Sequence, residues 1–386
     1  MKRICFLTDS IFSFGGVQRV TAVIAKELAK DYDVTIVTKD RPEQKDTTLY
    51  NLAESNIHYR FFSFPKVARW KQYFCKAYSY LYRRHLPQTR LTSDIYAHSS
   101  FPYEQRKALW TELQAGNYDV IIGVHAPLAV RLATCRCHLK GTRLIGWVHN
   151  SYEALFGEGS LYIGPELRKH YEFQLAKLDK TVVLCNDDAQ KYHLPTQVIY
   201  NPLTLVPDTP SKGTSKKFLA VGRFSRLHKG FDLLIEAFRI FAEQESEWTL
   251  DIVGEGVEEP LYHQLIEEYH LQERVHIHPF TNHVQQYYHD AQVYVLSSRW
   301  EGFGLVLVEA MAHGLPVVSS NLPTSKEIMG DFGLYFINGD VNGMARQMLA
   351  ATQLDWQEKS KQALQIAARF NLDTIINQWK QLIDER

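Results

Sequence analysis

Several features that would assign this chain to particular classes of protein are missing from it. The formal net charge is 0 over 386 residues, so no overall excess of positive charge points to nucleic acid. The five cysteines are scattered and lack the Cys-x-x-Cys spacing of zinc and redox sites, which fits a reducing cytoplasm. No run reaches the ~18 apolar residues of a membrane-spanning helix. The first apolar run, in MKRICFLTD, is too brief for the core of a signal peptide.

The length and the distribution of charge divide the chain into two parts. A chain of 386 residues exceeds the size at which one hydrophobic core usually stops growing, so two domains are expected. Residues 1–200 carry 27 Lys and Arg against 19 Asp and Glu, whereas residues 201–386 carry 16 against 24. We therefore expect the first half to prefer anionic surfaces.

Short β-rich runs alternate with helical stretches, beginning with ICFLT, GVQRVTAVIAKELAK and DVTIVT. This alternation predicts a parallel sheet built from βαβ units. The pattern restarts with FLAVG after the loop-rich segment NPLTLVPDTPSKGTSKK, which we interpret as the hinge between two Rossmann-like halves. Because ligands of open α/β sheets bind at the carboxyl ends of strands, polar residues at those ends are the first candidates for a site.

Two cations flank one such strand end in the second half. In FLAVGRFSRLHKG, Gly222 and Arg223 leave a strand, and Lys229 stands just before a helix. A single surface Lys or Arg is usually no more than a solvated charge. The pair becomes a candidate anion site because carboxylates follow at another strand end of the same half.

Those carboxylates lie in SSRWEGFGLVLVEAMAHG, where a strand, a glycine-rich turn and a helix follow one another. Glu301 stands in the turn and Glu309 near the start of the helix. A carboxylate accepts two hydrogen bonds from a vicinal diol, so Glu309 suits a ribose and Glu301 suits sugar hydroxyls. The backbone N–H groups of residues 302–305 suit a phosphate or hydroxyl oxygen. The alternative is that both glutamates have structural roles only.

Taken together, GRFSRLHKG and SSRWEGFGLVLVEAMAHGLPVV resemble the C-terminal domain of the retaining glycosyltransferases of family 4, whose signature is a Glu-x7-Glu pair. The similarity extends through FGGVQRV, WVHN, VIYNPL, IVGEG and RFNLDTIINQWKQLIDE. It implies the α/β GT-B fold, with two facing Rossmann-like domains that have parallel sheets. We expect an acceptor-binding domain at 1–200, a donor-binding domain at 201–365 and a helix at 366–386 that crosses back to the first domain.

The resemblance also implies a role for each candidate residue. The cation pair would bind the donor diphosphate in place of a metal ion, Glu309 would hold the ribose, and Glu301 would lie near the transferred sugar. His149, which ends the strand LIGWVH, would face that sugar from the first domain, although a lone histidine is more often packed or capping. The expected catalytic residues are Arg223, Lys229, Glu301 and His149. The expected donor-binding residues are Gly15, Gly16, Gly222, Gly302, Phe303, Gly304, Leu305 and Glu309. The expected acceptor-binding residues are Gln18 and Arg19.

Retention of the anomeric configuration follows from the resemblance alone. No residue of the first domain is an obvious covalent nucleophile, so a same-face, dissociative displacement is expected. In that mechanism the leaving phosphate oxygen helps to take the acceptor proton. A UDP-sugar is the expected donor, and no metal or other cofactor is expected.

Two patterns that could indicate a metal site receive other interpretations. Asp31 and Asp33 spell the Asp-x-Asp pattern of metal-dependent glycosyltransferases of another fold, but they lie between the helix ELAK and the strand VTIVT, in a predicted solvated turn. His276 and His278 share one side of the strand VHIH, but no third ligand is evident, so packing is favoured.

Residues 60–90 contain eight basic residues, many aromatic residues and no acidic residue. A helix from about Lys66 would align an apolar stripe of Val67, Trp70, Phe74, Ala77 and Leu81. A basic amphipathic helix of this kind can lie in an anionic membrane interface, and the expected membrane residues are Arg69, Trp70, Lys76, Arg83 and Arg84. An equal alternative is that the stripe packs on the first domain's own sheet. Nucleic acid is not an expected partner, because the known reader motifs are missing.

The sequence therefore predicts a cytoplasmic glycosyltransferase that moves a hexose or N-acetylhexosamine from a nucleotide sugar to a glycan or lipid-linked acceptor. Synthesis of a surface polysaccharide or glycolipid fits this reaction, and a peripheral position on the inner face of the plasma membrane is a further expectation. The alternatives are a nucleotide-sugar epimerase or glycogen-synthase-like enzyme of the same fold, and a catalytically silent membrane-associated binding protein. A Rossmann oxidoreductase is disfavoured because FLTDSIFSFGGVQRV lacks the Gly-x-Gly-x-x-Gly fingerprint.

Overall fold

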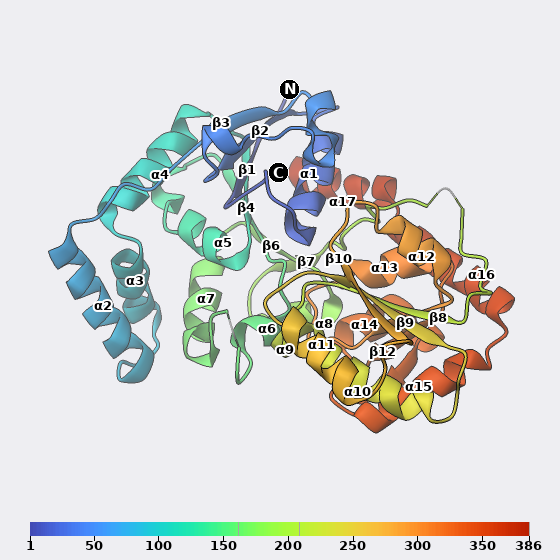
Figure 1. Cartoon of the computed structure of the whole chain (residues 1–386). Helices are drawn as coiled ribbons and strands as arrows, with labels where there is room; N and C mark the ends of the chain where they lie inside the picture. The colour runs from blue at the N-terminus through green and yellow to red at the C-terminus, as the bar shows by residue number, and fades with distance from the viewer. Residues whose placement is uncertain (161, 208, 386) are drawn as a thin grey trace. The chain divides into compact units, whose positions relative to one another are not determined.

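The computed structural model describes residues 1–160, 162–207 and 209–385, which form two compact units. Unit 1 comprises Met1–Tyr200 and Ile375–Arg386, and unit 2 comprises Asn201–Thr374. Figure 1 follows the chain through both units. The segment of unit 1 that follows unit 2 begins at Ile375, within the last helix, α17 (Leu372–Asp384).

Unit 1 is built on a seven-stranded parallel sheet with the order β3-β2-β1-β4-β5-β6-β7. β1 and β4 are almost wholly buried, as expected for parallel strands that helices cover on both faces. Ile4 of β1 pairs with Val34 on one side and Val120 on the other, so these strands end in register. The strands are β1 (Arg3–Thr8), β2 (Asp33–Thr38), β3 (His58–Phe61), β4 (Val120–Val124), β5 (Arg143–Trp147), β6 (Lys180–Val183) and β7 (Thr196–Val198).

The helices of unit 1 follow the spacing of apolar residues in the sequence. α1 buries Val20, Ile24 and Leu28, which are four residues apart and so share one face. α17 places the indole of Trp379 4.8 Å from that of Trp147, which packs the last helix on β5. The α-helices are α1 (Gly16–Leu28), α2 (Arg69–Arg84), α3 (Arg90–Ser100), α4 (Tyr103–Ala115), α5 (Ala126–Ala133), α6 (Tyr152–Phe156), α7 (Arg168–Leu175), α8 (Asn186–Lys191) and α17. The 3-10 helices are η1 (Pro42–Gln44), η2 (Leu49–Glu54), η3 (Arg136–His138) and η4 (Pro165–Leu167).

The basic segment of unit 1 forms a helix that differs from the expectation in two respects. α2 begins at Arg69 instead of about Lys66. Its apolar stripe does not pack on the sheet, because Trp70 is 63% exposed and Phe74 is 71% exposed. The helix is held instead from its other side, where the buried ring of Tyr82 stacks on Tyr96 of α3 at 4.6 Å. The alternative that the stripe is part of the domain core is therefore wrong.

Unit 2 is a second parallel sheet, of six strands in the order β10-β9-β8-β11-β12-β13. α10 shows why the sequence folds this way, since Phe231, Leu234 and Phe238 recur at helical spacing and are all buried. The strands are β8 (Lys217–Val221), β9 (Thr249–Gly254), β10 (Val275–Pro279), β11 (Val293–Leu296), β12 (Val317–Ser320) and β13 (Leu334–Phe336). The helices are α9 (Arg226–Lys229), α10 (Phe231–Ala242), α11 (Glu259–Glu268), α12 (Gln285–Asp290), α13 (Leu305–Ala312), α14 (Pro323–Met329), α15 (Val341–Thr352) and α16 (Trp356–Ala367), with the 3-10 helices η5 (Gly330–Phe332) and η6 (Ala368–Phe370).

Candidate active site

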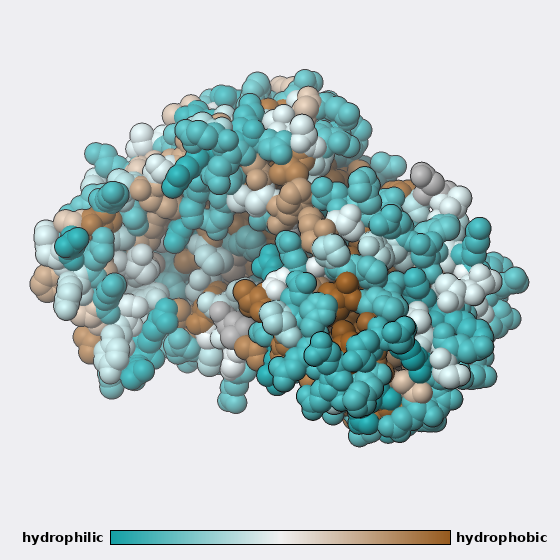
Figure 2. All heavy atoms as spheres, in the orientation of Figure 1, coloured by the Kyte–Doolittle hydropathy of each residue, from teal (hydrophilic) through white to brown (hydrophobic). Residues whose placement is uncertain are grey.

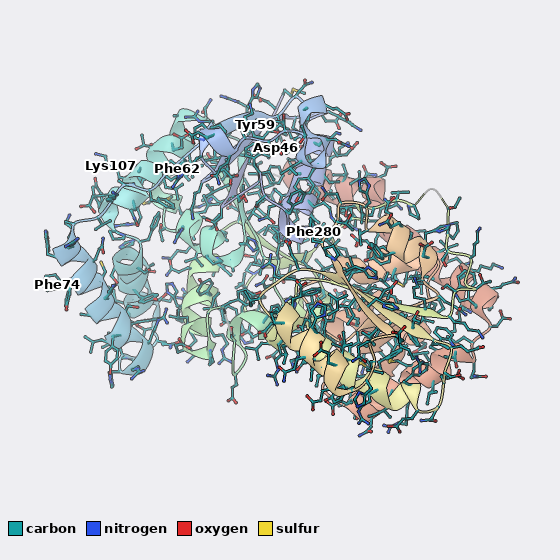
Figure 3. The ribbon with its side chains drawn as sticks, in the orientation of Figure 1. Asp46, Tyr59, Phe62, Phe74, Lys107 and Phe280 are labelled. Carbon is teal, nitrogen blue, oxygen red and sulfur yellow. The ribbon has the colours of Figure 1, made fainter. Side chains whose placement is uncertain are left out.

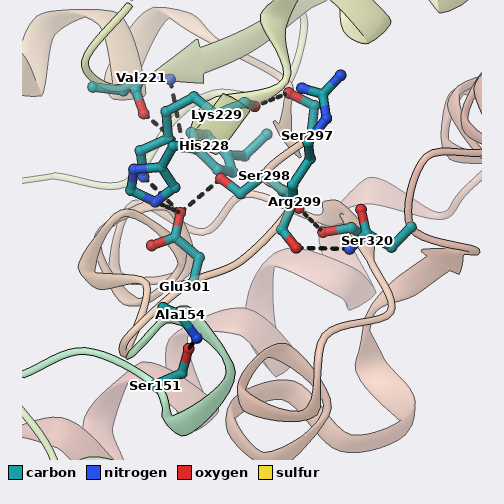
Figure 4. A network of polar contacts seen from close by, with 12 residues as sticks. Ser151, Ala154, Val221, His228, Lys229, Ser297, Ser298, Arg299, Glu301 and Ser320 are labelled. Carbon is teal, nitrogen blue, oxygen red and sulfur yellow. Dashed lines mark hydrogen bonds and ion pairs between the residues drawn. The ribbon is translucent and has the colours of Figure 1, made fainter. Parts of the chain in front are cut away.

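The centre of the candidate site in unit 2 is a buried ion pair at the carboxyl end of the sheet. β8 ends at Val221 and β11 at Leu296, and the short helix α9 brings Lys229 toward the end of β11. The Lys229 Nζ lies 2.5 Å from the Glu301 Oε1, and the two side chains are only 12% and 8% exposed. The hydroxyl of Ser298 donates to the same carboxylate oxygen at 2.6 Å. Figure 4 shows these groups converging on one oxygen of Glu301.

Electrostatics keep Glu301 ionised. Burial by itself raises the pKa of this carboxyl, but the neighbouring Lys229 and His228 outweigh it and hold the pKa well below its ordinary value. The His228 ring stacks on Trp300 at a centroid distance of 3.5 Å, and its Nε2 is 3.9 Å from the Glu301 Oε1. Burial lowers the pKa of His228, so the imidazole is neutral at pH 7 and Lys229 carries the positive charge beside Glu301.

Two glycines with positive φ allow the loops to approach this pair. Gly230, at φ 65°, separates α9 from α10, and a Cβ there would collide with the carbonyl oxygen of Ser297. Gly304, at φ 81°, stands at the N-cap of α13 and turns the chain from Glu301 into that helix. Phe303 is buried, with its ring 5.6 Å from that of Phe370, so the turn is fixed by packing within unit 2.

Glu309 lies at the same end of the sheet as Glu301. It is 2% exposed, and its Oε2 accepts a hydrogen bond of 3.2 Å from the Tyr288 hydroxyl. Burial raises the pKa of Tyr294 well above its ordinary value, and the charges of Glu301 and Glu309 add to this effect. Both carboxylates therefore lie close enough to act on one phenol, whose oxygen is 3.4 Å from the backbone of Val221. Glu301 and Glu309 thus both lie near Tyr294.

Arg223 differs from Lys229 in its surroundings. It follows Gly222 at the end of β8 and is exposed, and within the described ranges no hydrogen bond or ion pair engages its side chain. Its five N–H donors remain available to an anion. Lys229 shares its charge with Glu301 but keeps further N–H donors, since an ammonium has three. At this strand end, Arg223 therefore has no ion-pair partner among the described residues, whereas Lys229 is paired with Glu301.

In unit 1 the predicted site residue His149 follows β5 and is 5% exposed. Neither of its ring nitrogens has a hydrogen-bond partner among the residues that the structure describes. Buried polar groups of this kind are rare without a reason, and a ligand that binds the imidazole would supply one. Burial lowers the pKa of His149 well below its ordinary value, and the nearby His125 adds to this, so the ring is neutral.

His125 is a candidate that sequence reasoning missed. It follows β4 with φ 74° and ψ 147°, a conformation that is strained for any residue other than glycine. Its ring lies 5.3 Å from that of His149, and burial lowers its pKa while Asp9, just after β1, opposes this. The one available signal in the sequence was its position after the strand-like run DVIIGV, because backbone strain cannot be read from a pattern.

The remaining residues predicted in unit 1 lie at the start of α1. The Gly15 N–H donates to the Tyr50 hydroxyl at 3.1 Å, and Gly16 begins the helix, so Gln18 and Arg19 are in its first turn. A Cβ on Gly15 would collide with the side-chain oxygen of Gln18, which shows that this side chain folds back over the loop. Their roles in binding stay predictions.

The two metal-like patterns have other partners in the structure. Asp31 forms an ion pair of 2.6 Å with Lys380, and Asp33 begins β2, at the opposite end of the sheet from the carboxyl ends. His278 lies 3.3 Å from a carboxylate oxygen of Asp251. Throughout the described ranges, no three or more His, Cys, Asp or Glu side chains gather in a way that suits a metal ion.

Two family models match the chain. The model described as Glycosyltransferase Family 4 matches residues 14–207, and the model described as Glycosyl transferases group 1 matches residues 204–369. A protein of Haemophilus influenzae named as an uncharacterized glycosyltransferase is 27% identical over 408 residues, covering 99% of this chain and 100% of that protein. The amylovoran biosynthesis glycosyltransferase AmsD of Erwinia amylovora is 30% identical over 172 residues, which are 44% of this chain and 48% of AmsD.

The fold is also found among solved structures. The crystal structure of Anabaena HepE in complex with UDP and glucose matches with a TM-score of 0.72 and 20% identity, over 99% of each chain. Both proteins therefore share two parallel-sheet, Rossmann-like domains. Within the described residues, none of the helices is both long enough and apolar enough to cross a membrane.

Proposed function

Because this chain belongs to the GT-B glycosyltransferases, we propose that it transfers a hexose or N-acetylhexosamine from a UDP-sugar to a glycan or lipid-linked acceptor, with retention of configuration, as a member of family 4. The observation that carries the proposal is the buried Lys229–Glu301 pair, with Glu309 at the same end of the sheet. The UDP donor is supported by HepE, whose structure contains UDP and glucose. Surface polysaccharide synthesis is supported by AmsD, a protein of amylovoran biosynthesis.

In this reaction the bond between the anomeric carbon and the diphosphate oxygen breaks, and its electron pair stays on that oxygen. The negative charge that develops there is stabilised by Arg223 and Lys229, which bind the transition state more tightly than the ground state. The acceptor hydroxyl attacks on the same face of the sugar and passes its proton to the departing phosphate. No metal is needed in this proposal, because the two cations supply the positive charge.

Glu309 and Glu301 divide the recognition of the donor. Glu309 holds the ribose diol as an acceptor of two hydrogen bonds. Glu301 binds hydroxyls of the transferred sugar with its remaining lone pairs, and Lys229 and Ser298 fix its orientation. His149 contributes a neutral imidazole to the sugar from unit 1. An epimerase or a glycogen-synthase-like enzyme would use the same donor groups, but no observation favours either.

The proposal is tested by exposing the purified protein to a panel of UDP-, GDP- and ADP-sugars. A donor at 100 times its Kd stabilises the protein by about 2.7 kcal/mol, which for a unit of this size raises the Tm by about 5 to 10 °C. We expect this shift with a UDP-sugar, followed by slow donor hydrolysis. NMR of the transferred sugar then reports the anomeric configuration. If no nucleotide sugar shifts the Tm or is hydrolysed, the proposed function is wrong.

We also propose that the protein is cytoplasmic and works as a peripheral protein on the anionic inner face of the plasma membrane, through the outer face of α2. This face consists of Arg69, Trp70, Tyr73, Phe74, Lys76, Ala77, Tyr80, Leu81 and Arg84, all of which are exposed. Figure 2 shows hydrophobic residues at the surface over α2, and Figure 3 shows Phe74 on the outer side of the helix. At 100° per residue, the cations Arg69 and Lys76 lie along one edge of this face and Trp70 and Phe74 along the other.

The cations of α2 differ in whether they have an ion-pair partner. Arg83 lies 3.4 Å from Glu166, and Lys71 is paired with Glu104, so these two charges are directed toward the domain. Arg69 and Lys76 have no ion pair within the described part of the chain. A second copy of the chain is a poor occupant of this face, because a two-fold contact would place the same cations against each other.

Vesicle co-sedimentation tests the membrane proposal. Each cation near an anionic surface contributes about 1 kcal/mol, so Arg69→Glu/Lys76→Glu/Arg84→Glu should abolish the binding of the wild-type protein to phosphatidylserine vesicles at low salt. The matched control is Lys140→Glu/Lys169→Glu/Lys361→Glu, which reverses three exposed charges elsewhere and should still bind. Donor hydrolysis should persist in both variants. Wild-type protein that stays in the supernatant, or equal loss in both triple variants, would overturn the membrane proposal and leave the transferase proposal intact.

A further inference from the structure

Unit 1 contains a concave site that the proposed reaction does not use. A cavity of about 190 Å³ is lined by residues of α3, α5 and α7, together with Arg83 of α2 and Tyr162. We call it the α5 pocket, and its lining on α5 consists of Pro127, Val130, Arg131 and Thr134. It is smaller than the roughly 300 Å³ of pockets that hold drug-sized ligands, so it suits a single sugar residue.

Arg131 is the principal charged group of the α5 pocket. Its guanidinium lies over the rings of Phe64 and Phe101, 5.2 and 5.5 Å from their centroids. Those two rings meet edge to face at 5.2 Å, so the cation rests on a fixed aromatic surface. Within the described ranges no carboxylate pairs with Arg131, so its N–H donors are left for an anion.

A second arginine and a tyrosine extend the same surface. Burial raises the pKa of Tyr171 to about 12, and the positive charges of Arg131 and Arg83 both oppose this rise. The two guanidinium groups are therefore close enough to act on one phenol within the pocket. Arg83 is partly compensated, since its guanidinium lies 3.4 Å from Glu166, so the net charge of the pocket comes chiefly from Arg131.

The wall opposite α5 is held rigid by a buried polar network. The His170 Nδ1 is 2.9 Å from the Ser93 hydroxyl, which also accepts a hydrogen bond from Gln174 at 2.9 Å. The ring of His170 meets that of Tyr96 edge to face at 4.6 Å. Burial lowers the pKa of His170 to about 4, so at neutral pH this wall is uncharged and does not repel Arg131. The pocket is thus preformed, with one dominant cation and several aromatic rings.

We propose that the α5 pocket binds an acidic sugar residue of the acceptor, whose carboxylate or phosphate pairs with Arg131. A planar guanidinium binds a carboxylate or phosphate through two parallel hydrogen bonds. The aromatic rings of the pocket suit the apolar face of a pyranose, while its polar edge suits the hydroxyls. A neutral sugar would not pair with the guanidinium, and a bare inorganic ion would not pack on the aromatic rings.

The position of the pocket along α5 fits an extended acceptor. α5 begins just after the strained His125, which lies beside His149, and Arg131 stands six residues further on. Six residues of helix span about 9 Å, so a glycan whose reacting end lies near the two histidines can reach the pocket with a following residue. The inference rests on the proposed function for the identity of the acceptor, but not for the binding of the acidic sugar itself.

Calorimetric titration of the full-length protein, with UDP present to occupy the donor site, tests the proposal. The probes are glucuronate, glucose 6-phosphate and glucose, which present a carboxylate, a phosphate and neither. We expect saturable binding of at least one acidic probe and none of glucose. Arg131→Gln, which keeps a polar side chain but removes the charge, should weaken that binding about ten- to a hundredfold. The matched control is Arg168→Ala, which removes an exposed arginine of α7 outside the pocket and should leave binding unchanged.

The outcomes distinguish a carboxylate from a phosphate as the bound anion. They also distinguish failure of the pocket proposal from failure of the proposed function. Binding of glucuronate alone identifies a uronate residue, and binding of glucose 6-phosphate alone identifies a phosphorylated one. Equal binding by wild type and Arg131→Gln, binding of glucose as tight as that of the acids, or no binding of either acid would overturn the inference. Circular dichroism establishes that Arg131→Gln is folded, and Arg131→Lys should recover part of the affinity. Failure of a UDP-sugar to shift the Tm would count against the proposed function alone.

Discussion

The buried pair of Lys229 and Glu301 leads to a prediction that separates catalysis from stability. Lys229→Met removes the ammonium 2.5 Å from a carboxylate that is 8% exposed, so the mutation leaves a buried negative charge without its ion-pair partner. Breaking a buried pair in this way costs about 3 to 5 kcal/mol. We expect the lower end, about 3 kcal/mol, because Ser298 and His228 still face Glu301.

Arg223→Ala, unlike Lys229→Met, should have little effect on stability. Its side chain is exposed and makes no ion pair in the part of the chain that the structure describes, so its loss leaves the free energy of unfolding almost unchanged. In the proposed reaction both cations stabilise the departing diphosphate, and the loss of either costs about 3 kcal/mol of transition-state stabilisation. Turnover should therefore fall about a hundredfold or more in both variants.

A double variant completes the test. Lys229→Met/Glu301→Gln removes both charges, so it should regain most of the stability lost by Lys229→Met while its turnover stays as low. Urea unfolding of the full chain, analysed as separate transitions for its two units, measures stability, and donor hydrolysis measures turnover. The reasoning fails if Lys229→Met is as stable as wild type, if the double variant is less stable than the single one, or if Arg223→Ala and Lys229→Met keep normal turnover.

Three further predictions concern the carboxylates, metal and pH. Glu309→Ala should chiefly raise the donor Kd and Glu301→Ala should chiefly lower kcat, and equal effects on both parameters in steady-state kinetics would leave the roles unassigned. Activity should survive extensive treatment with EDTA, whereas a loss restored by manganese would contradict the metal-free reaction. His170 has a folded-state pKa of about 4 against an ordinary 6.5, so the unfolded chain binds more protons as the pH falls below 6.5. As the pH falls from 6.5 to 4, this group should lower the free energy of unfolding by about 1.4 kcal/mol per pH unit. In His170→Asn, the free energy of unfolding measured with urea should therefore depend less steeply on pH.

The sequence predicted the elements of the fold because its patterns are local. The alternation of buried strands with amphipathic helices such as α10 recurs through both units, and βαβ units can close only into parallel sheets. The pairing of Glu301 with Glu309 was also predictable, because a strand, a glycine turn and a helix fix where both carboxylates lie. Neither inference needed contacts between distant segments.

What the sequence could not supply depends on tertiary contacts. The apolar stripe of α2 has the same pattern whether it packs inward or faces solvent, and the structure resolves this through Tyr82, which packs on α3 from the other side. The α5 pocket joins α3, α5 and α7, whose lining residues are far apart in the chain. The ion pair of Lys229 and Glu301 likewise links positions 72 residues apart.

The candidate site residues of the two units differ in their charge. In unit 2 the charges are ionised and held in place, with Glu301 kept anionic by its neighbours and Arg223 left uncompensated for the departing diphosphate. In unit 1, burial keeps His149 neutral, and His125 is pushed in the same direction. Transfer of a glycosyl group passes through a sugar that carries partial positive charge, and a protonated histidine beside it would oppose that charge. A neutral imidazole can hydrogen-bond the sugar without this penalty. Burial leaves the ring nitrogens of His149 without a hydrogen-bond partner among the described residues, and the same burial keeps the ring neutral, as the proposed reaction requires.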